Sequence, residues 1–202
     1  MGKHTGSIDG EVLSRITKKK RGWVFTQTDF LDIGTLAAVR QALSRNSRAG
    51  AIRTLARGLY DYPHRHPRLG LMSASTDEIV KALRRRDAFR LQPTGANAAN
   101  VLGLSDQVPV RTVFLTDGRS RTIRIGKRTI LLKKTTPRQM ETAGRVSGTI
   151  IQALRWLGRR NVDEKTVSIL RRQLTARDKK VMLKDARYAP AWVSSVMKQI
   201  AE

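Results

Sequence analysis

The first stretch of helical periodicity lies near the start of the chain, at Ile8, Val12, Leu13 and Ile16. Ser7 precedes this stretch and can cap a helix with its hydroxyl, while the basic run at residues 18–21 suits a helix C-terminus. Gly22 then leads into Trp23-Val24-Phe25, which is too short for a helix and rich in β-favouring side chains. The pattern therefore predicts a helix followed by a short strand.

Two further helices are expected before residue 50. Thr26 and Asp29 have the spacing of a capping box, which predicts a short second helix, and residues 32–34 would form the turn after it. A longer helix is predicted from Thr35 to about Arg48. Its apolar stripe consists of Leu36, Val39 and Leu43. The other faces of this helix are polar and open to a ligand.

A hairpin is predicted directly after the long helix, which Gly50 ends. Residues 51–55 and 59–62 favour strands and flank Ala56-Arg57-Gly58, where the glycine suits a tight turn. A strand, two helices joined by a turn and a basic hairpin are a recurring device for placing a helix in the DNA major groove. The order therefore predicts a winged helix-turn-helix domain over residues 1–66.

The remaining residues, 67–202, follow a proline-bounded linker at 64–68 and are expected to form a C-terminal α+β domain. Its predicted elements are a helix from Thr76, a strand at 89–91, a helix at 95–102, strands at 110–116, 121–125 and 129–133, and helices after Pro137. The three strands are expected to form an antiparallel meander with Asp117-Gly118 as its first hairpin turn. One long amphipathic helix is expected from Met140 to Leu157, and the fold class is α+β.

The charge balance is strongly basic throughout the chain. There are 40 Lys and Arg against 16 Asp and Glu in 202 residues, a net charge of +24. Residues before His66 include 12 basic and 5 acidic side chains, a net +7, and those after it 28 and 11, a net +17. Such an excess is hard to keep compact without an anionic partner, so nucleic acid is the expected ligand. Because both parts are basic, both can contact phosphate.

Composition excludes several classes of protein. Without Cys, the chain cannot form disulfides, thiolate zinc sites or a cysteine nucleophile. No apolar run approaches the roughly 20 residues of a membrane span, and the N-terminus lacks the apolar core of a signal peptide. With 40% apolar residues, a globular protein of one or two domains is expected. We therefore expect a cytoplasmic protein without a membrane partner.

The polar side of the long helix supplies the candidate DNA contacts. Arg can bind guanine and Gln adenine through paired hydrogen bonds in the major groove, so Gln41 and Arg45 are assigned to base edges. Phosphate contacts are assigned to Thr35, Arg40, Ser44 and Arg48 on the helix. Arg53 and Arg57 on the hairpin are expected to meet the sugar-phosphate backbone or the minor groove. Lys18, Lys19 and Lys20 are further candidate contacts, although such a run more often marks a solvated helix end. A helix face that contacts only water would carry similar side chains, and each single residue retains this alternative. The group as a whole favours DNA.

Catalytic and metal-binding patterns are weak. The only histidines are His4 near the terminus and His64 and His66 in the linker, so no histidine pair has rigid support. The Gly6-Ser7 opening is similar to that of nucleotidyltransferases, but no paired aspartates follow on a predicted strand. Gly126-Lys127-Arg128 lacks the glycine spacing of a phosphate-binding loop. We therefore expect neither an enzyme nor a bound cofactor or metal.

Four segments follow one another in a characteristic order within the first 62 residues. They are Trp23-Val-Phe-Thr-Gln-Thr-Asp-Phe30, Val39-Arg-Gln-Ala-Leu-Ser-Arg45, Arg48-Ala-Gly-Ala-Ile-Arg53 and Gly58-Leu-Tyr60. In these segments the chain resembles the AbiEi-like antitoxins of type IV toxin–antitoxin systems, which act in abortive infection, a form of phage defence. The size and the basic, mixed second half are also similar.

This resemblance implies a bacterial, nucleoid-associated regulator with two domains. The first would repress its own operon by binding inverted repeats of double-stranded DNA, as a monomer or weak dimer, and the second would counteract a nucleotidyltransferase-like toxin. It implies DNA contacts for Arg40, Gln41, Ser44, Arg45, Arg53 and Arg57. The second half offers no motif that matches the family residue by residue, and a stand-alone regulator without a toxin is also compatible with the resemblance.

Two other functions stay open from the sequence. A non-catalytic RNA-binding or nucleoid-associated protein would use the +17 half as its main contact. A nuclease or nucleotidyltransferase is supported only by the substrate-like charge.

Overall fold

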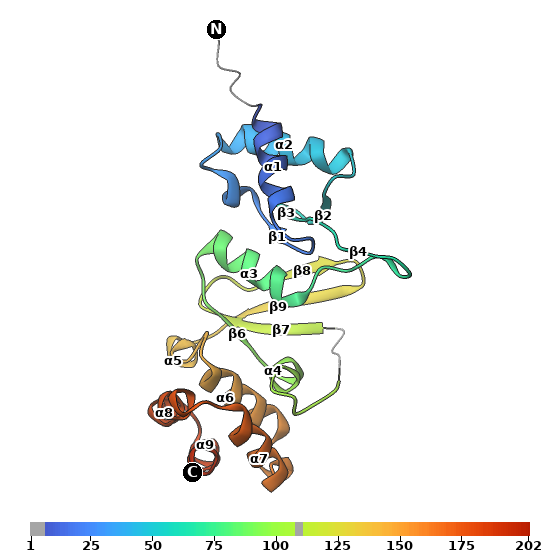
Figure 1. Cartoon of the computed structure of the whole chain (residues 1–202). Coiled ribbons are helices and arrows are strands. Elements are labelled where there is room, and N and C mark those ends of the chain that lie inside the picture. Colours follow the sequence, from blue (N-terminus) through green and yellow to red (C-terminus); the bar gives the residue numbers. More distant parts are fainter. Residues whose placement is uncertain (1–6, 108–110) are drawn as a thin grey trace. The chain divides into compact units, whose positions relative to one another are not determined.

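The computed structural model describes residues 7–107 and 111–202, and the chain divides into two compact units, Met1–Ala88 and Phe89–Glu202 (Figure 1). Each unit combines helices with a small sheet, so the protein belongs to the α+β class. His4 and Val110, which figured in the sequence predictions, lie outside the described residues. No helix of the described ranges is both long enough and apolar enough to cross a membrane.

The elements of the first unit follow the predicted order closely. They are α1 (Ile8–Lys18), β1 (Val24–Phe25), the 3-10 helix η1 (Gln27–Phe30), α2 (Leu36–Arg48), β2 (Arg53–Ala56), β3 (Leu59–Asp61), β4 (Arg65–His66), β5 (Gly70–Leu71) and α3 (Thr76–Asp87). The predicted second helix is thus a single 3-10 turn. It begins at the expected capping box, in which the Asp29 carboxylate accepts a hydrogen bond of 2.8 Å from the Thr26 backbone N–H.

The helices of the first unit form where caps and apolar faces coincide. The Ser7 hydroxyl accepts from the Gly10 N–H at 3.2 Å, and Thr35 caps α2 in the same way through the Ala38 N–H at 3.3 Å. The core between α1, α2 and the sheet consists of the buried residues Val12, Ile16, Phe25, Phe30, Val39, Ala42, Leu43 and Ile52. Each large side chain buried there contributes about 1.5 to 3 kcal/mol. The predicted stripe of α2 was wrong at Leu36, which is 43% exposed.

A three-stranded antiparallel sheet in the order β1-β3-β2 completes this core. The β2–β3 hairpin pairs Arg53 with Asp61 at its base and Ala56 with Leu59 at its tip, with a bulge in between. Gly58 occupies the turn with a φ of 68°, in the left-handed region that favours glycine. The hairpin predicted from the sequence is therefore confirmed as an element.

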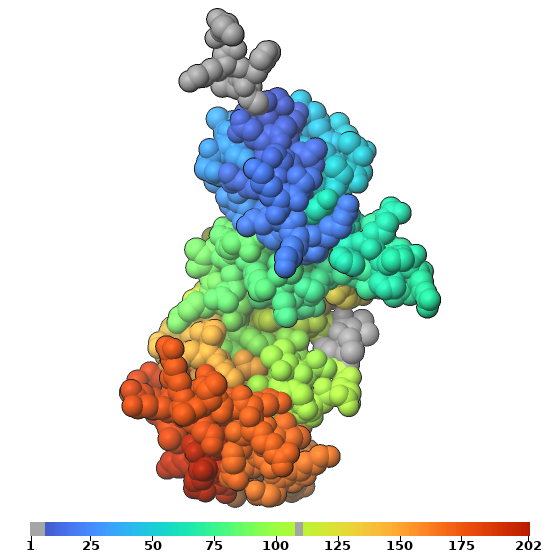
Figure 2. All heavy atoms as spheres, viewed as in Figure 1, coloured from blue at the N-terminus to red at the C-terminus, as the bar shows by residue number. Residues whose placement is uncertain are grey.

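The residues expected to link two domains belong instead to the first unit. β4 and β5 pair antiparallel, and their hairpin projects as a separate lobe in the space-filling view (Figure 2). After it, α3 buries Ile79 and Leu83 and attaches to the unit through Arg85, which donates to the Asp29 carboxylate at 2.7 Å and the Val24 carbonyl at 2.9 Å. The boundary between units consequently lies after Ala88 rather than at residue 66.

The second unit contains a four-stranded sheet and a helical cluster. Its elements are β6 (Leu91–Pro93), α4 (Ala96–Val101), β7 (Arg111–Thr116), β8 (Arg121–Ile125), β9 (Arg128–Lys134), α5 (Pro137–Met140), α6 (Val146–Leu157), η2 (Arg159–Asn161), α7 (Glu164–Gln173), α8 (Ala176–Asp185), η3 (Ala186–Tyr188) and α9 (Ala191–Ala201). The strands β7, β8 and β9 and the helix α4 lie where the sequence predicts them, whereas β6 begins at Leu91, the last residue of the strand predicted at 89–91.

The predicted meander is wrong in its topology. The strand order is β6-β7-β9-β8, and β7 pairs with β9 in parallel, so β7 and β8 are not neighbours. Asp117 does not close a hairpin turn between paired strands. Its carboxylate instead accepts from the backbone N–H and the guanidinium of Arg90, both at 2.8 Å, and so holds the end of β7 to the chain entering β6.

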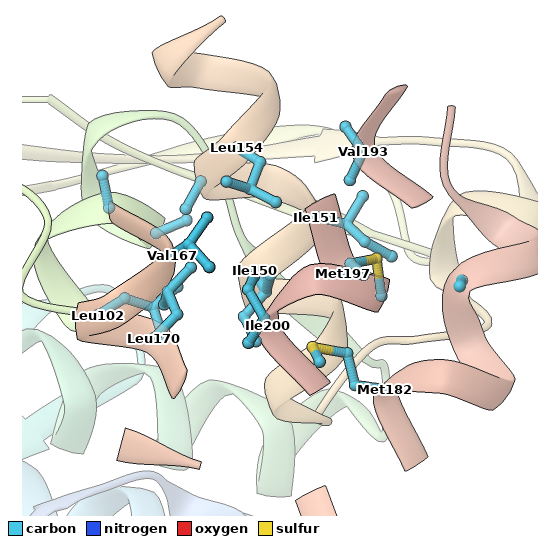
Figure 3. Packing of buried hydrophobic residues seen from close by; sticks show 14 residues of the cluster. Leu102, Ile150, Ile151, Leu154, Val167, Leu170, Met182, Val193, Met197 and Ile200 are labelled. Atoms are coloured by element: carbon cyan, nitrogen blue, oxygen red, sulfur yellow. The ribbon is translucent and has the colours of Figure 1, made fainter. Parts of the chain in front are cut away.

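The helical cluster surrounds α6, whose residues 147–154 are all buried. Figure 3 shows Ile150, Ile151 and Leu154 of α6 meeting residues of α7, α8 and α9, among them Met182 and Met197. The long helix predicted from Met140 is interrupted before α6. The reason is local, because Gly144 has a φ of 82° and Arg145 is extended, which no continuous helix allows.

Candidate nucleic-acid interface

The polar face of α2 is set by the burial of its opposite side. Val39, Ala42, Leu43 and Asn46 are buried against the first unit's core. At about 100° per residue, the centre of the outward face therefore falls on Ala37, Gln41, Ser44 and Arg48, with Arg40 and Arg45 at its two flanks. The outward face of α2 is thus polar, with one methyl group at its N-terminal end.

The side chains of this face differ in their exposure and in whether they are already hydrogen-bonded. Gln41, Arg40 and Arg48 are exposed, and none has a side-chain partner within residues 7–107 and 111–202. Ser44 is half-buried. Thr35 uses its hydroxyl as the cap of α2, so its contact with a phosphate would have to share that oxygen. Three of the predicted contacts are therefore open to a ligand, and two are restricted.

Arg45 is held by an acidic residue of α1. Its guanidinium lies 2.8 Å from the Asp9 carboxylate, while 60% of the Arg45 side chain stays exposed. The second carboxylate oxygen of Asp9 is buried without a hydrogen-bond partner in the described part of the chain. Arg45 can reach a base edge only by leaving Asp9. No pattern in the sequence indicates this pair, because the two residues are far apart along the chain.

Polar bonds fix the β2–β3 hairpin to the C-terminal end of α2. The hydroxyls of Ser47 and Thr54 lie 2.9 Å apart, and the Asn46 carbonyl accepts from the Ala51 N–H at 3.0 Å. The buried Asn46 amide also donates to the Ala42 carbonyl at 2.9 Å. Helix and hairpin consequently present their outer side chains as one surface within the unit.

The two arginines of the hairpin have different surroundings. The Arg53 guanidinium forms two hydrogen bonds with the Asp61 carboxylate, at 3.0 and 2.6 Å, and donates to the Met72 carbonyl at 2.9 Å. The hydrogen bond with Asp61 raises the pKa of Arg53 above its usual value. Arg57 is exposed in the turn and has no side-chain partner in the described ranges. Of the two predicted contacts, Arg57 is available and Arg53 is engaged in the fold.

The three predicted lysine contacts lie at the other end of the sheet. Lys18, Lys19 and Lys20 are exposed where α1 ends, just before β1. The register pairs Val24 of β1 with Asp61, at the base of the hairpin, whereas Arg57 occupies its tip. The lysine run is therefore separate from the surface formed by α2 and the hairpin turn.

An ion pair not predicted from the sequence fixes α1 against the turn before α2. Arg15 donates to both oxygens of the Asp32 carboxylate, at 2.7 and 2.6 Å, and to the Asp29 carbonyl at 3.1 Å. The hydrogen bond from Arg15 holds the pKa of Asp32 below its usual value. This pair connects α1 to the turn that precedes α2.

The described residues contain no group of three or more His, Asp or Glu side chains that could bind a metal ion. His66 uses its Nδ1 to accept from the N–H groups of Arg68 and Leu69, at 3.2 and 3.3 Å, and so closes the β4–β5 turn. This histidine, which the sequence placed in a linker, has a local structural role.

These features define an α+β protein whose first unit exposes a polar helix joined to a basic hairpin. A family model described as "Family of unknown function (DUF6088)" matches residues 11–182, and the chain belongs to this family. Among solved structures, the RV2827C protein from Mycobacterium tuberculosis is similar at 14% identity and a TM-score of 0.46, over 100% of this chain and 80% of that one. No curated protein sequence matches the chain.

Proposed function

We propose that α1 to β3 form a winged helix-turn-helix that binds double-stranded DNA, with α2 as the recognition helix and the β2–β3 hairpin as the wing. The observation that carries the proposal is the attachment of the hairpin to α2. The Ser47–Thr54 hydrogen bond of 2.9 Å and the bond from the Ala51 N–H to the Asn46 carbonyl attach the hairpin that carries the exposed Arg57 to the C-terminal end of α2. A helix in the major groove with a wing against the backbone needs such an attachment.

The outward face of α2 has the chemistry for reading bases. Gln41 can pair with adenine, and the Ala37 methyl suits contact with a thymine methyl. Arg45 can pair with guanine once it leaves Asp9. The Arg45–Asp9 ion pair is exposed and of low net strength, so a base edge can replace the Asp9 carboxylate. Arg40, Arg48 and Arg57 would contact phosphates on either side of the groove.

Charge supports the same ligand. Residues 1–88 include 17 Lys and Arg and 8 Asp and Glu, a net +9. Most of these acids are already paired, because Asp9, Asp29, Asp32, Asp61, Glu78 and Asp87 each contact an Arg or Lys. Arg40 and Arg48 of α2 and Arg57 of the hairpin turn have no acidic partner in the described ranges, which favours approach of a polyanion.

The test compares the full chain on its own upstream region and on random duplex of equal length, by fluorescence anisotropy at several salt concentrations. A sequence-specific protein would bind the upstream region about 1000-fold or more tightly than random duplex. Equal affinities with a steep salt dependence would identify a non-specific binder instead. Gln41→Ala should reduce the ratio without changing the net charge, and Lys133→Ala in the second unit shows separately what the loss of one surface cation does to both affinities.

The proposed regulator would act as a repressor of its own operon and as an antitoxin. Support for the antitoxin role comes from the sequence resemblance of the first 62 residues. Its test is co-expression with the product of the neighbouring gene, measured as bacterial growth. Rescue of growth by the full chain, and also by a Gln41→Ala/Arg57→Ala variant that no longer represses, would assign neutralisation to the second unit. Absence of toxicity from either neighbour would leave a stand-alone regulator.

A second candidate is binding of RNA by the second unit. Residues 89–202 include 23 Lys and Arg against 8 Asp and Glu, a net +15, which exceeds that of the first unit. Structured RNA added to the same anisotropy measurements separates the two candidates. Tighter binding to RNA than to the upstream duplex, unaffected by Gln41→Ala and Arg57→Ala, would favour this alternative.

A further inference from the structure

A cavity of about 510 Å³ lies within the first unit, at the base of its sheet. Its lining consists of Lys19, Lys20, Arg21, Gly22, Trp23, Asp61, His64, Met72, Ser73, Ala74, Ser75 and Glu78. These residues come from the loop between α1 and β1, from the end of β3 and the segment after it, and from the segment that leads into the first turn of α3. The volume falls in the range of about 300 to 1,000 Å³ that is usual for small-molecule sites.

The charges of this cavity do not cancel, because its two acids are already paired. The Asp61 carboxylate binds Arg53 at 2.6 Å, and the Glu78 carboxylate binds Lys81 at 2.8 Å. Lys19 and Lys20, in contrast, have no acidic partner in the described part of the chain. The cavity therefore presents a net positive charge to a ligand.

An aromatic ring forms part of the same wall. Trp23 is half-buried, and its ring packs against Phe25 and Phe30, with ring centroids 4.6 and 5.9 Å away. The Lys19 ammonium lies over the indole, 5.7 Å from its centroid, so a cation and an aromatic surface adjoin. An indole next to two ammonium groups that have no acidic partner suits a planar ring that carries a phosphate, since the ring can replace Lys19 over the indole while both lysines meet the phosphate.

Polar groups of the segment before α3 also line the cavity. Ser73 is exposed, and Ser75 caps α3 by accepting from the Glu78 N–H at 3.2 Å. The preceding segment is anchored, because the His64 carbonyl accepts from the Met72 N–H at 2.8 Å. This part of the lining is therefore a defined segment that adds hydrogen-bonding capacity.

We propose that this cavity binds a phosphorylated small molecule of the mononucleotide class, with Lys19 and Lys20 at the phosphate and Trp23 beneath the ring. The lysine run thereby gains a role different from the duplex contact assigned to it from the sequence. The inference is independent of the proposed DNA binding, because the cavity adjoins the base of the hairpin and Arg57 lies at the tip.

The experiment uses the full chain and three probes: AMP, adenosine and inorganic phosphate. Calorimetry is expected to show saturable binding of AMP, with adenosine and phosphate each at least about tenfold weaker, because each lacks one of the two contacts. Trp156→Phe/Trp192→Phe leaves Trp23 as the sole tryptophan, and its emission should change with the same AMP dependence. This second readout locates the site.

Lys19→Ala/Lys20→Ala should weaken AMP binding about tenfold or more, since two charge-assisted contacts are lost. Lys133→Ala/Lys134→Ala removes the same charge from exposed positions of β9 and should leave AMP binding within about twofold. Equal losses in both variants, or no change in Trp23 emission at saturating AMP, would overturn the proposal. A third outcome would also overturn it: AMP fails to bind the parent protein, and the Lys19→Ala/Lys20→Ala variant loses duplex binding. Lys19 and Lys20 would then be DNA contacts.

Discussion

The base and the tip of the β2–β3 hairpin each carry an arginine, and the two have different roles. At the base, Arg53 contacts Asp61 at 2.6 Å, and the side chain of Asp61 is only 1% exposed. At the tip, Arg57 is exposed and meets no acid in residues 7–107 and 111–202. The buried Asp61 carboxylate thus fixes Arg53 in the fold. Arg57 has no such carboxylate beside it and stays available for a ligand.

Arg45 of α2 lies between these two cases. It contacts Asp9 at 2.8 Å, but 60% of its side chain is exposed and the pair faces solvent. Exposed pairs contribute about 0 to 1 kcal/mol, so a ligand that supplies better-placed acceptors can replace Asp9. The local carboxylates thus decide which of the three arginines is free to reach an anionic partner.

Replacing Arg53 should have the largest effect on stability. In Arg53→Ala the Asp61 carboxylate would stay buried without its cation, and the Met72 carbonyl would lose a donor. We expect the free energy of unfolding to fall by about 3 kcal/mol, at the lower end for broken buried pairs because Arg53 itself is partly exposed. Urea unfolding followed by far-UV circular dichroism measures this loss.

The matched control is Arg57→Ala, which removes the same side chain from the tip and should change stability by less than about 0.5 kcal/mol. A double variant, Arg53→Met/Asp61→Leu, removes both charges and should be less destabilised than Arg53→Ala alone. If Arg53→Ala and Arg57→Ala unfold at the same urea concentration, the contrast between base and tip is wrong.

Replacing Arg45 should have the largest effect on sequence recognition. Loss of a paired contact with guanine should weaken binding to the operator by about 1 to 3 kcal/mol and binding to random duplex by less. Anisotropy measurements on both duplexes at one salt concentration give the ratio. An equal loss on both duplexes would assign Arg45 to the phosphates and leave base reading to Gln41.

Arg57→Ala should weaken binding to all duplexes alike, because a wing contact with the backbone carries no sequence information. The slope of log affinity against log salt should become shallower by about one, the change expected for one lost phosphate contact. Titrations at four or more salt concentrations determine the slope. An unchanged slope, with intact affinity, would remove the hairpin tip from the interface.

Local sequence signals predicted the first unit well because its contacts are local. The capping box at Thr26, the helix starting after Thr35 and the hairpin around Gly58 depend on side chains within a few residues of one another. The pairs Arg45–Asp9, Arg53–Asp61 and Arg85–Asp29 connect residues distant in sequence or in adjacent strands, and no periodicity reports them. The sequence therefore could not indicate that Arg53, assigned to DNA from its place on the hairpin, is bonded to Asp61 in the fold.

The second unit shows the same limit in its sheet. Strand positions follow from alternating apolar residues, but the parallel pairing of β7 with β9 places β8 at the edge and depends on contacts across the whole unit. Asp117-Gly118 has the composition of a hairpin turn, yet Asp117 is held by Arg90. Turn chemistry predicts where a chain bends and leaves open which strands then pair.

Asp9→Asn should have a smaller effect on DNA affinity, opposite in sign to that of the arginine replacements. The change removes the charge that competes for Arg45 while keeping the side-chain volume, so DNA binding should strengthen by less than about 1 kcal/mol. The affinities of the parent and Asp9→Asn proteins for the operator provide the measurement. The double variant Asp9→Asn/Arg45→Ala should show no gain over Arg45→Ala, and a gain there would mean that Asp9 acts through general charge repulsion.

The smallest expected effect is on the stability of the protein at acidic pH. The hydrogen bond from Arg15 lowers the pKa of Asp32 from an ordinary value of 3.8, so the folded state holds this carboxylate in its charged form more strongly than the unfolded state does. A depressed folded-state pKa contributes stability above the unfolded value, and this contribution is lost as pH falls through the folded value. The urea midpoint should therefore decrease below about pH 4, and less steeply in Asp32→Asn, which has no carboxylate to protonate at this position. Parallel curves for the two proteins between pH 5 and pH 2 would show that the Arg15–Asp32 pair makes no contribution to acid sensitivity.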